Sequence, residues 1–167
     1  MAKIIEREIE NFRKTLKLHG EKTLCNLLSA FLIWLFGVLI FIPLAGSINR
    51  ETEILCNLIF FSVFTFLVVQ SLPGLKEIVD SFSVLIAKRC ELKKGLNFEK
   101  SMVVFRRFSY IILIIVFYLF YAPLLMRFHS LINGVTLLLA LIWIFYLIIS
   151  ILPILFTEVL KWFSYEK

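Results

Sequence analysis

Three tyrosines share one face of an apolar stretch in the second half of the chain. Tyr118 and Tyr121 follow Tyr110 by eight and eleven residues, and at about 100° per residue these offsets bring all three to one side of an α-helix. A phenol hydroxyl without a hydrogen-bond partner is costly in hydrocarbon, so we expect Thr136 or Ser150 to pair with Tyr118. The face predicts either a ladder of phenols lining a path or ligand pocket, or tyrosines that anchor the helix at the membrane interfaces.

Small and hydroxyl residues recur in four-three spacing along the last apolar stretch, from Thr136 to Thr157. Such residues let membrane helices approach closely and hydrogen-bond across the contact, so this seam predicts helix packing, with a pore lining as the alternative. Ala30 and Gly37, seven residues apart in the first stretch, predict a similar close contact. The two faces together supply the pore-lining or helix-packing candidates Tyr118, Tyr121, Thr136, Ala140, Ser150 and Thr157.

Groups that perform covalent catalysis or bind metals are scattered along the chain. Cys25, Cys56 and Cys90 are expected at different depths, and His19 and His129 on opposite sides of a membrane. Hydrolysis or group transfer needs a nucleophile with a base, paired carboxylates or a metal site, and coupled transport needs ionisable groups within the spans. We therefore expect no enzyme, no cofactor and no metal site.

The composition is that of a membrane protein. Apolar residues make up 60% of the chain without counting glycine, whereas soluble domains average about half with glycine included. Four stretches approach the ~20 residues that a helix needs to cross a bilayer, and none contains a charged residue or histidine. A charged segment precedes the first of them, so we expect no cleavable signal peptide. These predicted spans are 24–45, 54–72, 108–126 and 134–155.

The prolines suggest an internal repeat. Pro43 and Pro73 are thirty residues apart, and Pro123 and Pro153 repeat that spacing eighty residues later. A duplicated hairpin of two spans predicts two parallel units related by an axis along the membrane normal. The alternative is a chance coincidence among spans of similar length. We predict an all-α integral membrane protein with four transmembrane helices as two tandem hairpins.

Basic residues set the expected orientation, because lysine and arginine are retained on the cytoplasmic side. Six precede the first span, eight lie between the second and third, and only Arg50 and Arg127 fall on the other side. We expect a multi-pass protein of the cell membrane with both termini cytoplasmic. The net charge of +6 at that face suits anionic lipid headgroups or is only a topology signal; the headgroup candidates are Lys93, Lys94, Arg106 and Arg107. Acidic residues interrupt the basic ones, so nucleic acid is not an expected partner.

The segments outside the spans are expected to be helical. Residues 1–23 show amphipathic spacing, and residues 74–107 combine an apolar stripe with a turn at Gly95 and a potential cap at Asn97. The predicted order is an N-terminal helix, a hairpin over 24–73, a cytoplasmic helical hairpin over 74–107, a second hairpin over 108–156 and a tail over 157–167. In the second span, Asn57 and Gln70 are expected to reach the interfaces.

Two functions fit these features. The first is a homo-oligomeric channel or pore-like transport protein, because four helices pack solid and a path would have to run between copies. The second is a non-enzymatic scaffold that docks a cytosolic protein on its cytoplasmic helices. The docking candidates are Ile78, Phe82 and Leu85.

Overall fold

The chain is all-helical with four long apolar helices, as predicted. The computed structural model describes residues 9–10, 12–94 and 97–165. Within these ranges it describes every side chain except those of His19, residues 91–94 and residues 158–165. Every described residue is helical apart from Asn49, Asn97 and His129. Some predicted features lie outside the described part: the start of the N-terminal helix, the side chains of Lys93 and Lys94, the turn at Gly95 and the tail side chains beyond Thr157.

Four continuous helical segments make up the fold. The first contains two π-helical turns, η1 and η2, and has no break before Asn49. Each segment contains a part long and apolar enough to cross a membrane. The elements are η1 (Leu16–Gly20), α2 (Glu21–Phe36), η2 (Gly37–Phe41), α3 (Ile42–Ile48), α4 (Arg50–Lys94), α5 (Phe98–Phe128) and α6 (Ser130–Tyr165). Helices run through the expected boundaries at residues 23, 73, 107 and 156.

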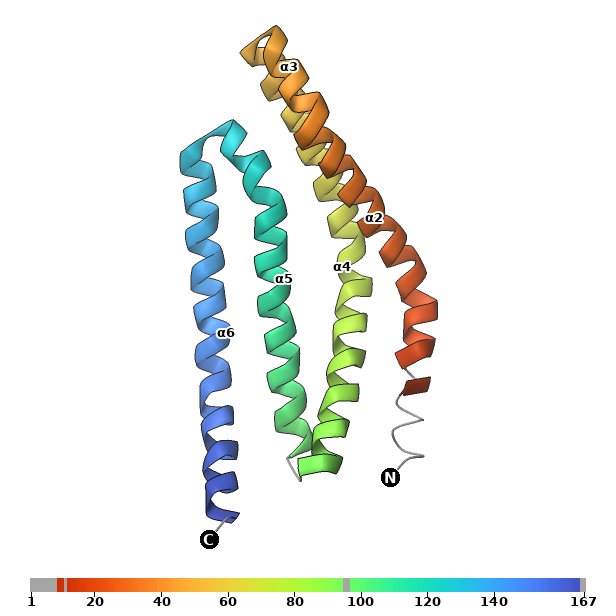
Figure 1. Ribbon diagram of the computed structural model, residues 1–167, viewed down its shortest axis with the longest axis vertical. Helices are drawn as coiled ribbons and strands as arrows, with labels where there is room; N and C mark the ends of the chain where they lie inside the picture. Colours follow the sequence, from red (N-terminus) through yellow and green to blue (C-terminus); the bar gives the residue numbers. More distant parts are fainter. Residues whose placement is uncertain (1–8, 11, 95–96, 166–167) are drawn as a thin grey trace.

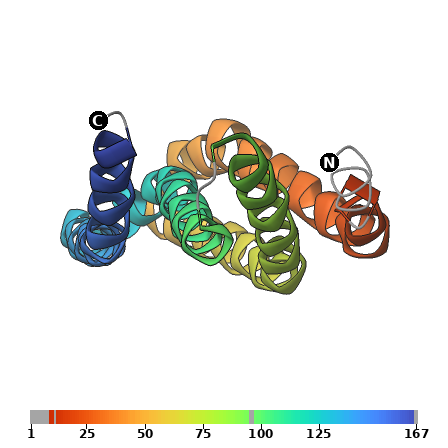
Figure 2. The same ribbon diagram turned by 90° about the horizontal axis from the view of Figure 1, so that it is seen from below.

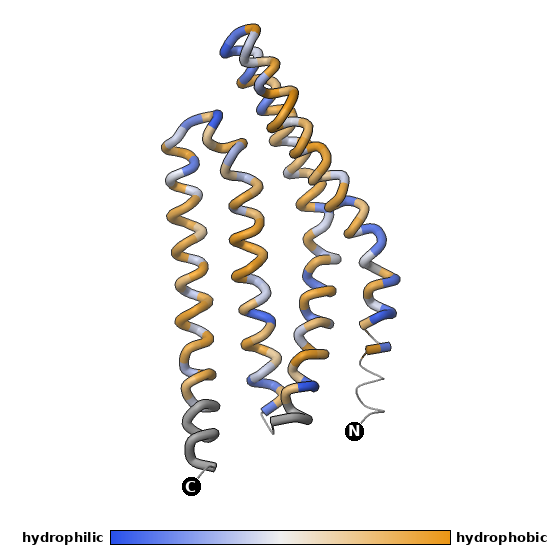
Figure 3. Tube along the Cα trace, viewed as in Figure 1, coloured by the Kyte–Doolittle hydropathy of each residue, from blue (hydrophilic) through white to orange (hydrophobic). Residues whose placement is uncertain are grey.

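The helices follow one another across the molecule in a row. α2 packs against α4, α4 against α5, and α5 against α6 (Figures 1 and 2). α6 thus lies at one edge, with α5 between it and α4. Polar residues gather at the two ends of the bundle (Figure 3). We call the end with the α4–α5 connection the hairpin end, and the opposite end the turn end.

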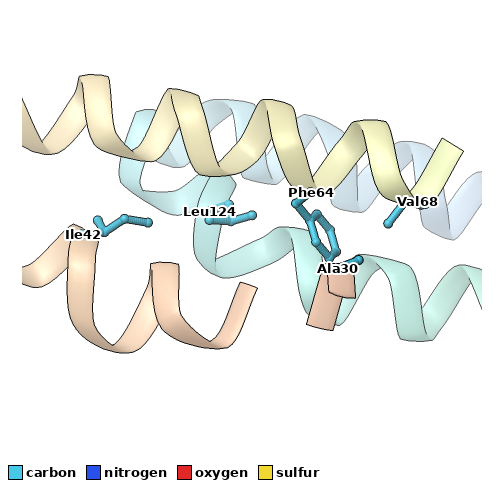
Figure 4. Close-up of a cluster of buried hydrophobic side chains, with 5 residues drawn as sticks. All are labelled: Ala30, Ile42, Phe64, Val68 and Leu124. Carbon is cyan, nitrogen blue, oxygen red and sulfur yellow. The ribbon is translucent and has the colours of Figure 1, made fainter. Parts of the chain in front are cut away.

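The main buried apolar cluster lies among α2, α3, α4 and α5 and contains no residue of α6. Phe64 is 3% exposed, and its ring centroid lies 5.0 Å from that of Tyr121 and 6.4 Å from that of Phe120. Figure 4 shows the buried side chains of the core spread along the contact between the helices, with the Phe64 ring beside Ala30. The buried cluster is Ala30, Ile42, Phe64, Val68 and Leu124.

After each break between the long helices, a side chain caps the start of the next helix. The Asn97 Oδ1 accepts a hydrogen bond from the backbone N–H of Glu99 at 3.1 Å, which confirms the predicted cap. The Asn49 Oδ1 accepts one from the N–H of Thr52 at 2.7 Å, and the His129 Nδ1 one from the N–H of Leu131 at 3.2 Å. These bonds satisfy donors that a helix start leaves open.

Two polar contacts join α4 to α5 near the turn end. Arg127 and Glu53 form a salt bridge with 2.8 Å between Nη1 and Oε1. Asn57 was expected to reach an interface, but this was wrong: it is 0% exposed, and its Nδ2 donates to the backbone oxygen of Leu124 at 3.0 Å. The bond forms because the Asn57 side chain points toward α5 and not toward the end of α4.

Side chains of neighbouring helices bind backbone carbonyls next to two of the prolines. A proline lacks the N–H that would bond the preceding turn and bends the helix, which opens carbonyls of that turn to other donors. Three residues before Pro123, the Phe120 oxygen accepts a bond of 2.7 Å from Trp34 Nε1. Three residues before Pro153, the Ser150 oxygen accepts one of 2.6 Å from Arg107 Nη1. The prolines in α5 and α6 are thus accommodated by their neighbours.

Replacing Trp34 by phenylalanine is expected to lower the free energy of unfolding by about 1 kcal/mol, typical of a hydrogen bond between membrane helices. The ring survives, but the Phe120 oxygen loses its donor. Denaturation with sodium dodecyl sulfate in mixed micelles, followed by circular dichroism, measures the change. Trp143→Phe is the control, since Trp143 is largely exposed. Equal effects of the two substitutions would contradict a role for this bond.

Candidate functional site

A groove runs along α5 between α4 and α6. Its half toward the hairpin end is a cavity of about 510 Å³, and its half toward the turn end is one of about 420 Å³. Both cavities contact Ile114 and Phe117, so they are two halves of one feature, which we call the α5 groove. Its walls include Leu72, Leu75 and Lys76 of α4, Tyr110, Leu113, Tyr118, Tyr121 and Leu125 of α5, and Thr136, Ala140, Trp143 and Leu147 of α6.

The structure brings together the two faces that the sequence singled out. The phenol face of α5 and the seam of α6 line opposite sides of the same groove. Of the six pore-lining or packing candidates, four line the groove near the turn end: Tyr118, Tyr121, Thr136 and Ala140. Ser150 and Thr157 do not. The Ser150 carbonyl binds Arg107, and the exposed Thr157 donates its hydroxyl to the Ile154 oxygen at 2.9 Å.

Two of the three tyrosine hydroxyls in the groove have partners on the flanking helices. The Tyr121 hydroxyl donates to Thr65 Oγ1 of α4 at 3.2 Å. The Tyr118 hydroxyl donates to Asn133 Oδ1 of α6 at 3.4 Å, rather than to Thr136 or Ser150 as predicted. Asn133 is buried one turn closer to the turn end, where α6 approaches α5. With these hydroxyls paired, the groove presents rings and aliphatic chains, and its surface is almost wholly apolar.

Charged residues gather where the groove meets the hairpin end. Lys76 and Tyr110 line the groove there. Arg106 and Asp80 both lie within electrostatic reach of the Tyr110 hydroxyl. The Asp80 Oδ1 is buried and has no hydrogen-bond partner among the described residues. Arg107 reaches across to α6, so both described headgroup candidates lie near this end of the groove.

A second cavity lies on the other side of the α4–α5 contact, next to α2. It measures about 290 Å³ and shares Leu75, Leu113 and Phe117 with the groove. Its lining contains no polar side chain. The contact between α4 and α5 is therefore bordered by an apolar cavity on each side at this level.

The predicted docking stripe on α4 is partly occupied by the chain itself. Ile78 and Leu85 are half-buried, and Phe82 is 43% exposed. The Phe82 ring centroid lies 6.3 Å from that of Phe12 in the N-terminal segment. This stripe thus serves as an internal packing surface for at least part of its length.

The groove can enclose an apolar molecule, or the chain of an amphiphile, with basic residues at one end. Within the described part of the chain, no group of three or more His, Cys, Asp or Glu residues could hold a metal ion. Sequence reasoning missed Lys76, Asn133 and Trp34 as site or packing residues, because their roles depend on which helix lies beside them. For Lys76, the signal in the sequence was its place as the first basic residue after the second predicted span.

Comparison with known proteins identifies no relative: no protein-family model, no curated protein and no solved structure matches this chain.

Proposed function

We propose that the protein is a non-enzymatic, multi-pass membrane protein that forms a homo-oligomeric, pore-like path along the α5 groove. The observation that supports this proposal is the meeting of the phenol face of α5 with the seam of α6 in one groove. In this proposal the four helices cross the cell membrane as two tandem hairpins, and the hairpin end is cytoplasmic.

The open shape of the groove favours more than one copy. One chain supplies three walls, from α4, α5 and α6, and a second copy would close the open side. In the part of the chain that the structure describes, α6 packs mainly on α5 and keeps most of its large apolar side chains exposed, so it is available for such a contact. An apolar lining of this kind can gate conduction by excluding water. The path is thus expected to be closed at rest and to need a stimulus to open.

Filling the groove is expected to reduce conduction. Ala140→Trp places a large ring beside Tyr118 and Thr136, and we expect ion flux through liposomes under voltage or osmotic tension to fall about tenfold, equivalent to about 1.4 kcal/mol in the barrier. Leu39→Trp is the control: it adds a tryptophan on η2, away from α6, at a side chain that is 63% exposed and does not line the groove.

The oligomeric mass in detergent tests whether the protein forms homo-oligomers, as the proposal requires. A strict monomer, together with flux no greater than that of empty vesicles under every stimulus, would overturn it. Equal loss of flux in Ala140→Trp and Leu39→Trp would place the path elsewhere.

The scaffold function has less support than the pore. Its docking stripe on α4 already contacts the N-terminal segment through Phe82, and Ile78 and Leu85 are half-buried. A cytosolic protein would have to displace those contacts or use the opposite faces of the hairpin.

A further inference from the structure

The hairpin end of the α5 groove combines a chain-shaped apolar space with a charged rim. The cavity of about 510 Å³ is within the ~300–1,000 Å³ typical of ligand sites. Its walls are side chains such as Leu72, Leu113 and Leu147, and its rim holds Lys76 and the half-buried Tyr110. A ligand that matches this space has a long apolar part and a polar head at one end.

The balance of charge at the rim favours an anionic head. Lys76 lines the groove, Arg106 lies one turn before the groove-lining Tyr110 on α5, and Arg107 binds the Ser150 carbonyl at the same end. Two acidic residues oppose these three basic ones: Asp80, also near the Tyr110 hydroxyl, and Glu77, next to Lys76 on α4. Lys76 is exposed, so its ammonium group is accessible to a head outside the cavity.

In the proposed orientation, these groups lie at the depth of lipid headgroups. Lys76 follows the second predicted span by four residues, and Arg106 and Arg107 directly precede the third. The cavity next to α2 is also apolar, but its lining offers no polar side chain that could select a head. Of these two cavities, the groove is the one whose lining includes a charged side chain that can select a head.

We propose that the α5 groove binds an anionic phospholipid, with one acyl chain along α5 and its phosphate at Lys76 and Arg106. The chain would lie between Leu113 and Leu147 and extend toward Phe117. The inference rests on the proposed function in taking the groove to lie in a bilayer, but it does not require conduction.

Native mass spectrometry of the full-length protein in detergent tests this site. The probes are phosphatidylglycerol, phosphatidylcholine of the same chains, and glycerol phosphate, which has no chains. We expect phosphatidylglycerol to bind about 25-fold more tightly than phosphatidylcholine, since Lys76 and Arg106 each contribute a factor of about five. Glycerol phosphate is expected not to compete, because the acyl chain supplies the contacts within the cavity.

Charge variants give effects of opposite sign. K76Q/R106Q is expected to weaken phosphatidylglycerol binding about 25-fold and to leave phosphatidylcholine binding unchanged. K17Q/K22Q removes the same charge from exposed positions on η1 and α2, and is the matched control, with a change within about twofold. D80N removes an opposing charge, and is expected to strengthen phosphatidylglycerol binding about fivefold. Misfolding would not produce that gain.

Equal binding of the two phospholipids would overturn the lipid site, as would equal losses in K76Q/R106Q and K17Q/K22Q. Competition by glycerol phosphate would show a site for free anions instead. Selective lipid binding without ion flux would overturn only the pore, whereas flux without lipid selectivity would overturn only the lipid site.

Discussion

Replacing Phe64 by alanine is expected to lower the free energy of unfolding by about 3 kcal/mol. Phe64 is 3% exposed and packs edge-on against Tyr121, within a cluster that joins α2, α3, α4 and α5. In soluble proteins a Phe→Ala change in the core costs about 3–5 kcal/mol, through transfer and cavity terms. Between membrane helices the transfer term is small, because lipid is as apolar as the protein interior, so we expect the lower part of that range.

Phe66→Ala is the matched control for this prediction. It deletes the same ring two residues away on α4, where the side chain is 61% exposed. Lipid or detergent fills the space that the lost ring leaves, and the expected change is below about 0.5 kcal/mol. Denaturation with sodium dodecyl sulfate in mixed micelles measures both variants. Similar losses for Phe64→Ala and Phe66→Ala would mean that this cluster does not hold the helices together.

The features that the sequence predicted are those that depend on the spacing of side chains and on the length of the apolar stretches. Four stretches of about twenty apolar residues became four long helices, and the Asn97 cap formed where the chain pattern changes. The phenol face of α5 and the seam of α6 were also visible, since side chains eight or eleven residues apart share a face. Their presence in one groove was not visible, because nothing in a single sequence says how two helices are rotated about their axes.

What the sequence missed are contacts between helices that are distant in the chain. Asn57 was assigned to an interface from its position in the span, but it bonds a carbonyl of α5. The donors for the carbonyls near Pro123 and Pro153 come from Trp34 and Arg107, which are 86 and 43 residues away from their acceptors. Such bonds depend on which helices are neighbours and on how far each is shifted along its axis. The periodic spacing of residues within one helix determines neither.

The close approach of η2 and α4 at Gly37 confirms a contact that the sequence did suggest. Ala30 and Gly37 lie seven residues apart, and both are buried. A Cβ atom at Gly37 would lie 2.6 Å from Cδ1 and 2.8 Å from Cγ of Phe60. These atoms are close to the stem of the Phe60 side chain, and its ring stacks on Phe41 at a centroid distance of 5.5 Å. The ring cannot simply turn aside without losing that contact.

Gly37→Leu is therefore expected to lower the free energy of unfolding by about 3 kcal/mol, at the upper end of the cost of overpacking a core. The leucine must push α2 away from α4 at the level where η2 leads into α3 and Pro43. Gly134→Leu is the matched control, because a Cβ atom there meets nothing within 4 Å. Both substitutions add the same side chain to a helix, where leucine is favoured over glycine by less than about 1 kcal/mol, so the difference between them isolates the steric term. Titration with sodium dodecyl sulfate in mixed micelles gives that difference directly. If Gly37→Leu proves as stable as Gly134→Leu, the α2–α4 contact is looser than the distance to Phe60 requires.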